Sequence, residues 1–428
     1  MHLTEQGAQI RPSATLAINE LINSLRHKGE EVYHLGFGEA PFPVHPNVRK
    51  ALCENAHRKR YLPTQGILPL REQIAKFYDE ILGIQYSEEQ IIIGPGSKML
   101  MFAALGSLSG TLFLPAPSWV SYQHQAHFVS KEVRHIPTSV EDSYRLTPEV
   151  FEKAIQEHSS DREQQKILLL NYLCNPTGHS YSASQLKAIV EIARENNVII
   201  MSDEIYALVS FQGEKHHSIA EFYPEGTLVF GGVSKDRSLG GYRVGVMLLP
   251  EKETNLMRAM LSVGSEVWSC VSAPIQYAAI EAYKTTPDII DFIKDCTSIH
   301  EIVSKYIHGR LIEAGINCPE PQGAFYLFPD WNQYKEELAQ KGITTSIELA
   351  QALLKEQKVA SLPGSEFGMR EENLCIRIAL VDYDGELALQ HYRQNKDVLK
   401  KGQTQFIQAI APRLVKACNQ IAGFTNLP

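Results

Sequence analysis

The sequence lacks several features that would each indicate a different class of protein. Its apolar runs, such as residues 166–174, are far shorter than the ~20 residues of a membrane-spanning helix. Residues 1–11 contain no apolar signal core. The 41 Lys and Arg residues do not exceed the 49 Asp and Glu residues, and the basic residues form no cluster. We therefore expect a soluble, cytoplasmic protein with no nucleic-acid or membrane partner.

The chain also lacks the cysteine and histidine spacings of common metal sites. Its seven cysteines include no CxxC pair, and its fifteen histidines, His216 and His217 among them, include no HExxH. We therefore expect neither a disulfide framework nor a metal site. The cysteines are interpreted as small buried hydrophobes. For Cys174 the alternative is a redox role.

What the chain does contain is an alternation of short apolar runs with stretches of helical spacing. Continuous apolar runs of this length are typical of strands buried on both faces of a sheet. The expected strands are residues 90–93, 111–114, 167–170, 198–201, 228–230 and 243–249, and the expected helices include residues 98–108, 182–196 and 253–263. This order predicts an α/β fold with a mainly parallel sheet.

The length of 428 residues predicts a large and a small domain rather than one unit. The pattern changes after residue 320, where residues 323–328 and 374–380 are expected strands. A long helix near residues 287–314 would connect the domains. The predicted division is an N-terminal segment at residues 1–40 packing with the small domain, a large domain at residues 41–300 and the small domain at residues 301–428.

Two polar motifs follow expected strands. Residues 171–178, NYLCNPTG, contain an Asn-Pro-x-Gly sequence that on its own favours a turn. Residues 201–206, MSDEIY, place Asp203 at the end of a strand, where parallel sheets bind ligands. Asp203 could equally cap the following segment.

A third motif, VFGGVSKDRSLGGYRVG at residues 229–245, contains two basic residues near a strand end. Desolvation would lower the pKa of Lys235 and make its amine available for a Schiff base. The alternative is a solvated loop lysine. Arg243 opens a further apolar run, where an unpaired guanidinium would be costly, and a phosphate is its natural counter-ion.

The two remaining motifs are short. GPGSK at residues 94–98 precedes an expected helix, whose free N–H groups would bind an anion. It does not match the Walker A pattern, and GFGEA at residues 36–40 lacks the third glycine of a dinucleotide loop. Arg377 lies inside the apolar run LCIRIAL, where it is either paired structurally or aimed at a carboxylate ligand.

In this order, the motifs resemble those of class I pyridoxal-phosphate-dependent aminotransferases of fold type I. The resemblance covers nearly the whole chain, from PSATLAINE at residues 12–20, through LGFGEAPFP and YLPTQGILPLREQI, to beyond Arg377. PSAT, Lys98 and SWVSY at residues 118–122 make the chain most similar to the bacterial aspartate aminotransferase branch.

The resemblance implies roles toward pyridoxal 5′-phosphate. Lys235 would bind the cofactor as a Schiff base and then move the proton at the substrate Cα. Asp203 would pair with the pyridine nitrogen, while Asn175 and Tyr206 would hydrogen-bond the phenolic oxygen. The phosphate would be held by Gly96, Ser97, Lys98, Ser234 and Arg243, and by Tyr61 of the neighbouring subunit of a homodimer. Trp119 would stack on the ring, although Trp119 and Trp268 could instead belong to the core or an interface.

The resemblance also implies a substrate site. Arg377 would clamp the α-carboxylate with help from the backbone of Gly38. Thr15 and Lys98 match positions that contact a distal carboxylate, and Trp119 and Asn175 would line the same site. These residues predict ping-pong transamination between an L-amino acid, first of all aspartate or glutamate, and a 2-oxo acid.

Three alternatives stay open. Lys98 could only add charge beside the phosphate, which would leave an aromatic or neutral substrate. The cofactor could serve β-elimination, as in C–S lyases of the same fold. A cofactor-binding scaffold without turnover is the non-enzyme alternative, and the intact set of motif residues argues against it.

The chain departs from the family pattern at several places, one of which is a short linker between the helix after Lys98 and the next strand. Three residues before Lys235, Gly232 stands where the family often has a second phosphate-binding serine, so one hydrogen bond would be missing. Residues 39–41 read Glu-Ala-Pro where the family has Glu-Pro. The family turn also implies a cis peptide before Pro176.

Overall fold

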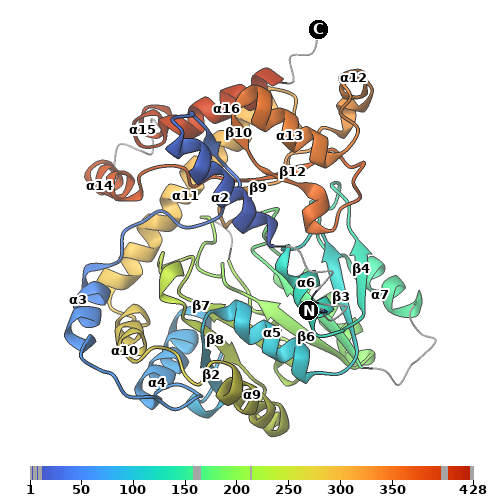
Figure 1. Ribbon diagram of the computed structural model, residues 1–428. Helices are drawn as coiled ribbons and strands as arrows, with labels where there is room; N and C mark the ends of the chain where they lie inside the picture. Colours follow the sequence, from blue (N-terminus) through green and yellow to red (C-terminus); the bar gives the residue numbers. More distant parts are fainter. Residues whose placement is uncertain are drawn as a thin grey trace.

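The computed structural model describes residues 12–157, 165–212, 215–396 and 403–424, together with the single positions 2 and 7. Within these residues, seven strands form the main sheet in the order β2–β8–β7–β6–β5–β3–β4 (Figure 1). Their bounds are β2 Ile91–Gly94, β3 Thr111–Ala116, β4 Val133–Pro137, β5 Lys166–Asn171, β6 Val198–Asp203, β7 Thr227–Gly232 and β8 Gly245–Leu248. Strand β8 is antiparallel to both neighbours and the other pairings are parallel, which confirms the mainly parallel sheet.

Both faces of this sheet are covered, and this explains the continuous apolar runs. In β5, Ile167 and Leu169 pack in one buried cluster, whereas Leu168 and Leu170 pack in another on the opposite face. The first cluster includes residues of α5 (Ser97–Ser107), α6 (Ser121–Phe128) and α9 (Thr254–Val267). The second includes residues of α7 (Pro148–Glu157) and α8 (Ala183–Glu195).

A second group of elements lies above the main sheet in Figure 1. It contains the antiparallel sheet β11–β12–β9 and the parallel pair β1–β10. The strands are β1 Tyr33–His34, β9 Tyr326–Leu327, β10 Val359–Ala360, β11 Leu362–Pro363 and β12 Ile376–Ala379. Because β1 pairs with β10, the N-terminal segment joins the C-terminal part of the chain.

The helix α11, Pro287–Glu313, runs between the two groups and packs against α14, α15 and α16 (Figure 1). The other helices of the described chain are α2 Ala14–His27, α3 Pro46–Asn55, α4 Leu68–Phe77, α10 Ala273–Ala282, α12 Lys335–Gln340, α13 Ser346–Gln357, α14 Gly385–Asn395, α15 Gln403–Ile410 and α16 Pro412–Phe424. None of the described helices combines the length and the apolarity needed to cross a membrane. The predicted domain boundaries stay a prediction.

Candidate active site

Most of the predicted site residues line one cavity of about 410 Å³. The cavity lies where the carboxyl ends of β5, β6 and β7 face β9 and β12, as expected for ligands of a parallel sheet. The predicted residues that line it are Thr15, Gly38, Ser97, Lys98, Trp119, Asn175, Asp203, Tyr206, Ser234, Lys235, Arg243 and Arg377. The fold therefore gathers motifs that are far apart in the sequence.

Lys235 follows β7 and reaches across the cavity. Its Nζ donates a hydrogen bond of 2.7 Å to the carbonyl oxygen of Gly38. The ammonium lies 5.8 Å from the ring centroid of Tyr206 and 5.7 Å from that of Phe325. The contacts of the amine are thus a neutral carbonyl oxygen and two aromatic faces, rather than a carboxylate. An amine held in this way can react as a nucleophile and form a Schiff base.

Asp203 ends β6 as a buried carboxylate. Tyr122 donates its hydroxyl to Oδ2 at 2.6 Å, and the backbone N–H of Ile205 donates to Oδ1 at 3.2 Å. Burial raises the pKa of Asp203 to about 6, although both hydrogen bonds act to lower it. A cationic ligand group beside Asp203 would favour its ionised form.

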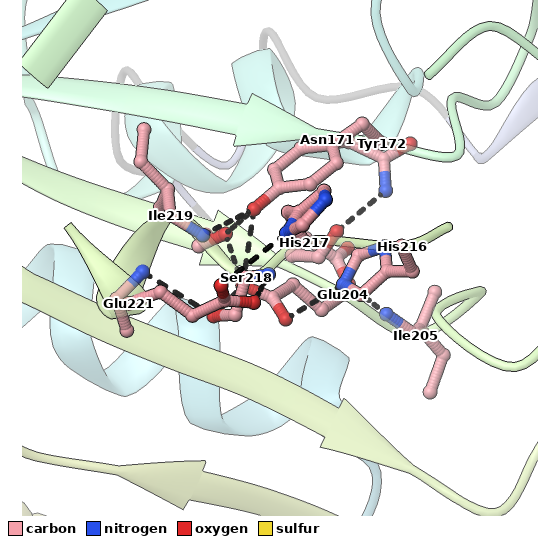
Figure 2. A network of polar contacts seen from close by, with 12 residues as sticks. Asn171, Tyr172, Glu204, Ile205, His216, His217, Ser218, Ile219 and Glu221 are labelled. Carbon is pink, nitrogen blue, oxygen red and sulfur yellow. Dashed lines mark hydrogen bonds and ion pairs between the residues drawn. The ribbon is translucent and has the colours of Figure 1, made fainter. Parts of the chain in front are cut away.

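The next residue, Glu204, belongs to a buried polar network (Figure 2). Its Oε1 accepts the hydroxyl of Ser218 at 2.7 Å, and its Oε2 lies 3.0 Å from Nε2 of His216. Tyr172 donates to Oε1 at 3.3 Å and accepts the backbone N–H of Ile219 at 2.7 Å. The network ties residues 216–219 to the ends of β5 and β6, and so fixes the backbone that carries Asp203.

The N-terminus of α5 forms a cationic corner of the cavity. Gly96 precedes the helix with a φ of 86°, and a Cβ at this position would lie 2.2 Å from Nη2 of Arg243. Burial lowers the pKa of Lys98, and the nearby charges of Arg243 and Lys235 lower it further. Several cations and free helix N–H groups at one corner fit an anion such as a phosphate.

Arg243 adopts a left-handed conformation with a φ of 55°. Its Nη1 donates to the carbonyl oxygen of Gly240 at 3.0 Å, and its Nη2 donates to that of Pro95 at 3.4 Å. This conformation is uncommon for a residue with a side chain, and strain of this kind often accompanies a functional site.

Arg377 is 1% exposed and lies on β12, a strand of the small antiparallel sheet. Its Nη1 donates to Oδ1 of Asn175 at 3.4 Å, and its Nη2 donates to the carbonyl oxygen of Gly36. Its Nε is buried and has no hydrogen-bond partner among the described residues. A desolvated guanidinium with neutral partners and a free N–H suits a carboxylate ligand.

The turn that carries Asn175 corrects one expectation. Asn175 donates its backbone N–H to Oδ1 of Asn171 at 2.8 Å. The cis peptide expected before Pro176 was wrong, because the cis bonds of the described chain are Ala116–Pro117 and Tyr172–Leu173. The reversal is instead made by Gly178, which has a φ of 73° and donates to the carbonyl oxygen of Cys174 at 2.7 Å.

Two predicted residues contribute side chains near the cationic corner. Trp119 lines the cavity with Nζ of Lys98 4.8 Å from its ring centroid and Tyr122 packed edge-on at 5.2 Å. Thr15, on α2, lines the cavity, and its buried Oγ1 has no hydrogen-bond partner within the part of the chain that the structure describes. An unpartnered buried hydroxyl in a cavity is a sign that a polar ligand group belongs there.

Two other predicted residues lie outside the cavity lining. Gly96 packs against the guanidinium of Arg243, and Tyr61 is 90% exposed on the surface. The sequence also missed residues that do line the cavity, among them Tyr122, Asn171 and Tyr326. For Tyr122 and Asn171 the signal was present, since each lies within a quoted motif.

The structure explains the glycine at position 232. A Cβ there would lie 2.7 Å from the carbonyl oxygen of Val244 and 3.3 Å from Cα of Gly245. Strands β7 and β8 approach each other so closely at this end that a serine would collide with the backbone. Local packing therefore favours glycine over serine at this position.

Comparison with known proteins assigns the family. Residues 30–385 match the family model for aminotransferases of class I and II. The chain is 34% identical over 377 residues to the aspartate aminotransferase of Geobacillus stearothermophilus, which covers 86% of this chain and 92% of that protein. The chain belongs to the class I and II aminotransferases.

Other aminotransferases show the breadth of this similarity. The aspartate aminotransferase of Bacillus subtilis is 32% identical, covering 87% of this chain and 93% of that protein. The asparagine–oxo-acid transaminase of Streptococcus mutans is 29% identical, covering 86% and 93%. The aspartate aminotransferase of Thermus thermophilus with maleate is 24% identical with a TM-score of 0.83 over 99% of both chains, which shows the shared fold.

Aminotransferases of class I use pyridoxal phosphate, and the cavity fits this group. Lys98 and Arg243 form an anion corner, Gly96 leaves room beside them, Asp203 is a buried acid and Lys235 offers an amine. When bound, the cofactor supplies an electron-withdrawing ring that stabilises negative charge at the substrate Cα. The enzyme thus catalyses pyridoxal-phosphate-dependent transamination.

Proposed function

We propose that this aminotransferase takes its amino group from aspartate or glutamate and gives it to a 2-oxo acid by a ping-pong mechanism. The observation that carries the proposal is the presence of cations at two places in one cavity, Arg377 on β12 and Lys98 on α5. A dicarboxylic amino acid has one carboxylate for each. The names of the relatives from Geobacillus stearothermophilus and Bacillus subtilis support the same donor.

We assign Arg377 to the α-carboxylate. Its guanidinium can present two parallel N–H groups to one carboxylate, and its buried, unpartnered Nε would gain a partner. The backbone of Gly38 and the side chains of Trp119 and Asn175 complete this side of the cavity.

We assign the distal carboxylate to Lys98 and Thr15. Both line the cavity, and the hydroxyl of Thr15 is buried without a partner. Lys98 also lies near Arg243 and Lys235, whose charges lower its pKa. A second carboxylate beside Lys98 would pair with its ammonium group, raise its pKa again and so favour acidic over neutral substrates.

We assign the proton transfer at the substrate Cα to Lys235, whose amine has no carboxylate among its hydrogen-bond partners. Asp203 is assigned to the ring nitrogen of the cofactor, and Asn175 and Tyr206 to its phenolic oxygen. Trp119 is assigned to the ring face. The phosphate is assigned to Ser97, Lys98, Ser234 and Arg243 with the backbone of Gly96.

We further propose a homodimer in which Tyr61 contacts the phosphate of the neighbouring subunit. Tyr61 is 90% exposed, and two exposed apolar residues lie at helix ends, Leu68 (45%) at the start of α4 directly after its loop and Val267 (55%) at the end of α9. A Cβ at Gly264 of α9 would lie 2.8 Å from Thr64 of the same loop, so loop and helix form one surface. Sedimentation of the purified protein tests the dimer. A cytoplasmic location stays a prediction.

A panel of half-reactions tests the substrate. The protein loaded with pyridoxal phosphate is mixed with each amino acid, and the decay of the absorbance band of the bound cofactor is followed. Aspartate and glutamate should react at least about 10-fold faster than alanine, phenylalanine or cysteine conjugates, the smallest effect expected from one charged hydrogen bond. Release of ammonia and pyruvate from cysteine conjugates would contradict the proposal in favour of β-elimination.

A variant of Lys98 distinguishes its two assignments. If Lys98 binds the distal carboxylate, Lys98→Met lowers kcat/KM for aspartate much more than for alanine. If it only adds charge beside the phosphate, both substrates lose activity in equal measure and the affinity for pyridoxal phosphate falls. Equal losses would contradict the proposed acidic donor.

A further inference from the structure

Tyr326 touches three groups of the site, although no motif pointed to it. It lies on β9, is 1% exposed and lines the same cavity as Lys235. Its position is fixed by pairing with Ala379 of β12, two residues after Arg377. The following inference rests on the proposed roles of Tyr206 and Arg377.

The hydroxyl of Tyr326 lies 2.8 Å from the hydroxyl of Tyr206, within hydrogen-bond distance. The two rings meet edge to face, with centroids 5.7 Å apart at 81°. A phenol has one proton to donate and lone pairs with which to accept. If the Tyr206 hydroxyl donates its hydrogen bond to an anionic oxygen in the cavity, its lone pairs are left to accept a hydrogen bond from the Tyr326 hydroxyl.

Such a chain of two hydroxyls strengthens the bond at its end, because each hydrogen bond polarises the next. Tyr206 is buried, and burial raises its pKa well above the ordinary value, with Tyr326 adding to the effect. The hydroxyl of Tyr206 therefore stays protonated and acts as a hydrogen-bond donor. Because Tyr326 orients this hydroxyl, it affects the strength of the hydrogen bond that Tyr206 donates in the cavity.

The ring of Tyr326 serves Arg377. The guanidinium carbon lies 4.9 Å from the ring centroid of Tyr326 and 5.4 Å from that of Phe367. The attraction between a cation and an aromatic face is strongest when the cation is desolvated, so the two rings help to hold the guanidinium in place. The hydroxyl also fills the space beside Gly38, where a Cβ would lie 2.1 Å from it.

We infer that Tyr326 is a positioning residue for this aminotransferase: its hydroxyl orients Tyr206 toward the cofactor, and its ring holds Arg377 for the substrate carboxylate. The two halves of this role are separable. Tyr326→Phe removes the hydroxyl and keeps the ring, whereas Tyr326→Leu removes both.

The experiment for the hydroxyl is a pH titration of the absorbance band of bound pyridoxal phosphate in wild type, Tyr326→Phe, Tyr206→Phe and the double variant. Tyr326→Phe should raise the midpoint by about 0.3–1 pH unit, which corresponds to the net free energy of one hydrogen bond. The midpoint rises because Tyr206 then stabilises the anionic phenolic oxygen of the cofactor less well. In the Tyr206→Phe background the same substitution should have no effect. Tyr383→Phe, at a half-buried tyrosine outside the cavity lining, is the control and should leave the midpoint unchanged.

The ring is tested by the binding of succinate, a dicarboxylate, to the loaded protein. Tyr326→Leu should bind succinate about 2–30-fold more weakly than Tyr326→Phe, the range expected for a lost cation–π contact. An unchanged midpoint in Tyr326→Phe, an equal shift in both backgrounds, or equal succinate binding by the two variants would each overturn the inference while the proposed function stands. A wild type that forms no band with pyridoxal phosphate would contradict both.

Discussion

The ammonium of Lys235 and the carbonyl oxygen of Gly38 are joined by a hydrogen bond of 2.7 Å that links the end of β7 to the N-terminal segment. The amine is thus presented to the cavity by a neutral partner. Lys235→Ala should abolish the visible band of bound pyridoxal phosphate and lower kcat by at least about 10²-fold, the loss expected for a general acid–base. Lys252→Ala, at an exposed lysine, is the control. A variant that keeps both band and turnover would remove Lys235 from its role.

Arg377→Lys should lower kcat/KM for aspartate by about 10–100-fold, mainly through KM. An ammonium keeps the charge but cannot form two parallel hydrogen bonds to a carboxylate, and each such bond to a charged group contributes about 1.5–3 kcal/mol. Steady-state kinetics with aspartate and 2-oxoglutarate measure the effect. Unchanged kinetics would mean that the α-carboxylate binds elsewhere.

Asp203→Asn should stabilise the cofactor-free protein at neutral pH. Burial raises the folded-state pKa of Asp203 from 3.8 to about 6, so folding takes up a proton between these values and stability falls as the pH rises through this window. Above pH 6 the cost is on the order of 2–3 kcal/mol, and an asparagine removes it. Urea unfolding at pH 4 and pH 7.5 should show the two proteins converging at the lower pH. A constant difference across the range would contradict the shifted pKa.

Glu204→Ala should lower the free energy of unfolding by about 3–5 kcal/mol, because it leaves His216, Ser218 and Tyr172 buried without their common partner. Glu195→Ala, an exposed glutamate at the end of α8, should change the stability by less than about 0.5 kcal/mol. Chemical denaturation compares the two. Equal stabilities would show that the network in Figure 2 contributes little to the fold.

Gly232→Ser should restore the serine of the family pattern without restoring its function. Its Cβ would meet the carbonyl oxygen of Val244 at 2.7 Å, and overpacking of this kind costs about 1–3 kcal/mol. Gly241→Ser, where a Cβ meets nothing within 4 Å, is the matched control. Thermal unfolding and titration with pyridoxal phosphate measure both effects. A serine variant with tighter cofactor binding and unchanged stability would refute the packing explanation for Gly232.

The central strands could be predicted from the sequence because both of their faces are buried. Each residue of β5 is apolar apart from its ends, so no register or partner was needed to recognise it. Strand β4 was missed because it lies at the edge of the sheet, where Arg134 and His135 are exposed. An edge strand with exposed side chains lacks the continuous apolar run by which the buried strands were recognised.

The site residues also fall into two groups, those that a local sequence pattern predicts and those that depend on tertiary packing. Residues such as Lys235 and Asp203 could be predicted because a short motif places each at the end of an apolar strand. Tyr326 could not, since GAFYLF reads only as a buried strand and its function depends on how close β9 comes to Tyr206. That distance is a property of tertiary packing, and no spacing within one segment encodes it.

The position of β2 at the edge of the main sheet has a consequence for the order of assembly on the ribosome. Among the described strands β2 pairs only with β8, yet the two are separated in the sequence by all the other strands of that sheet. Ser97 and Lys98 emerge early, directly after β2, but their strand has no partner until residue 248 has been synthesised. Contacts of such long separation form late. The cationic corner at the start of α5 therefore depends on the β2–β8 pairing, which has the longest sequence separation in the large sheet, and we expect it to form late in folding.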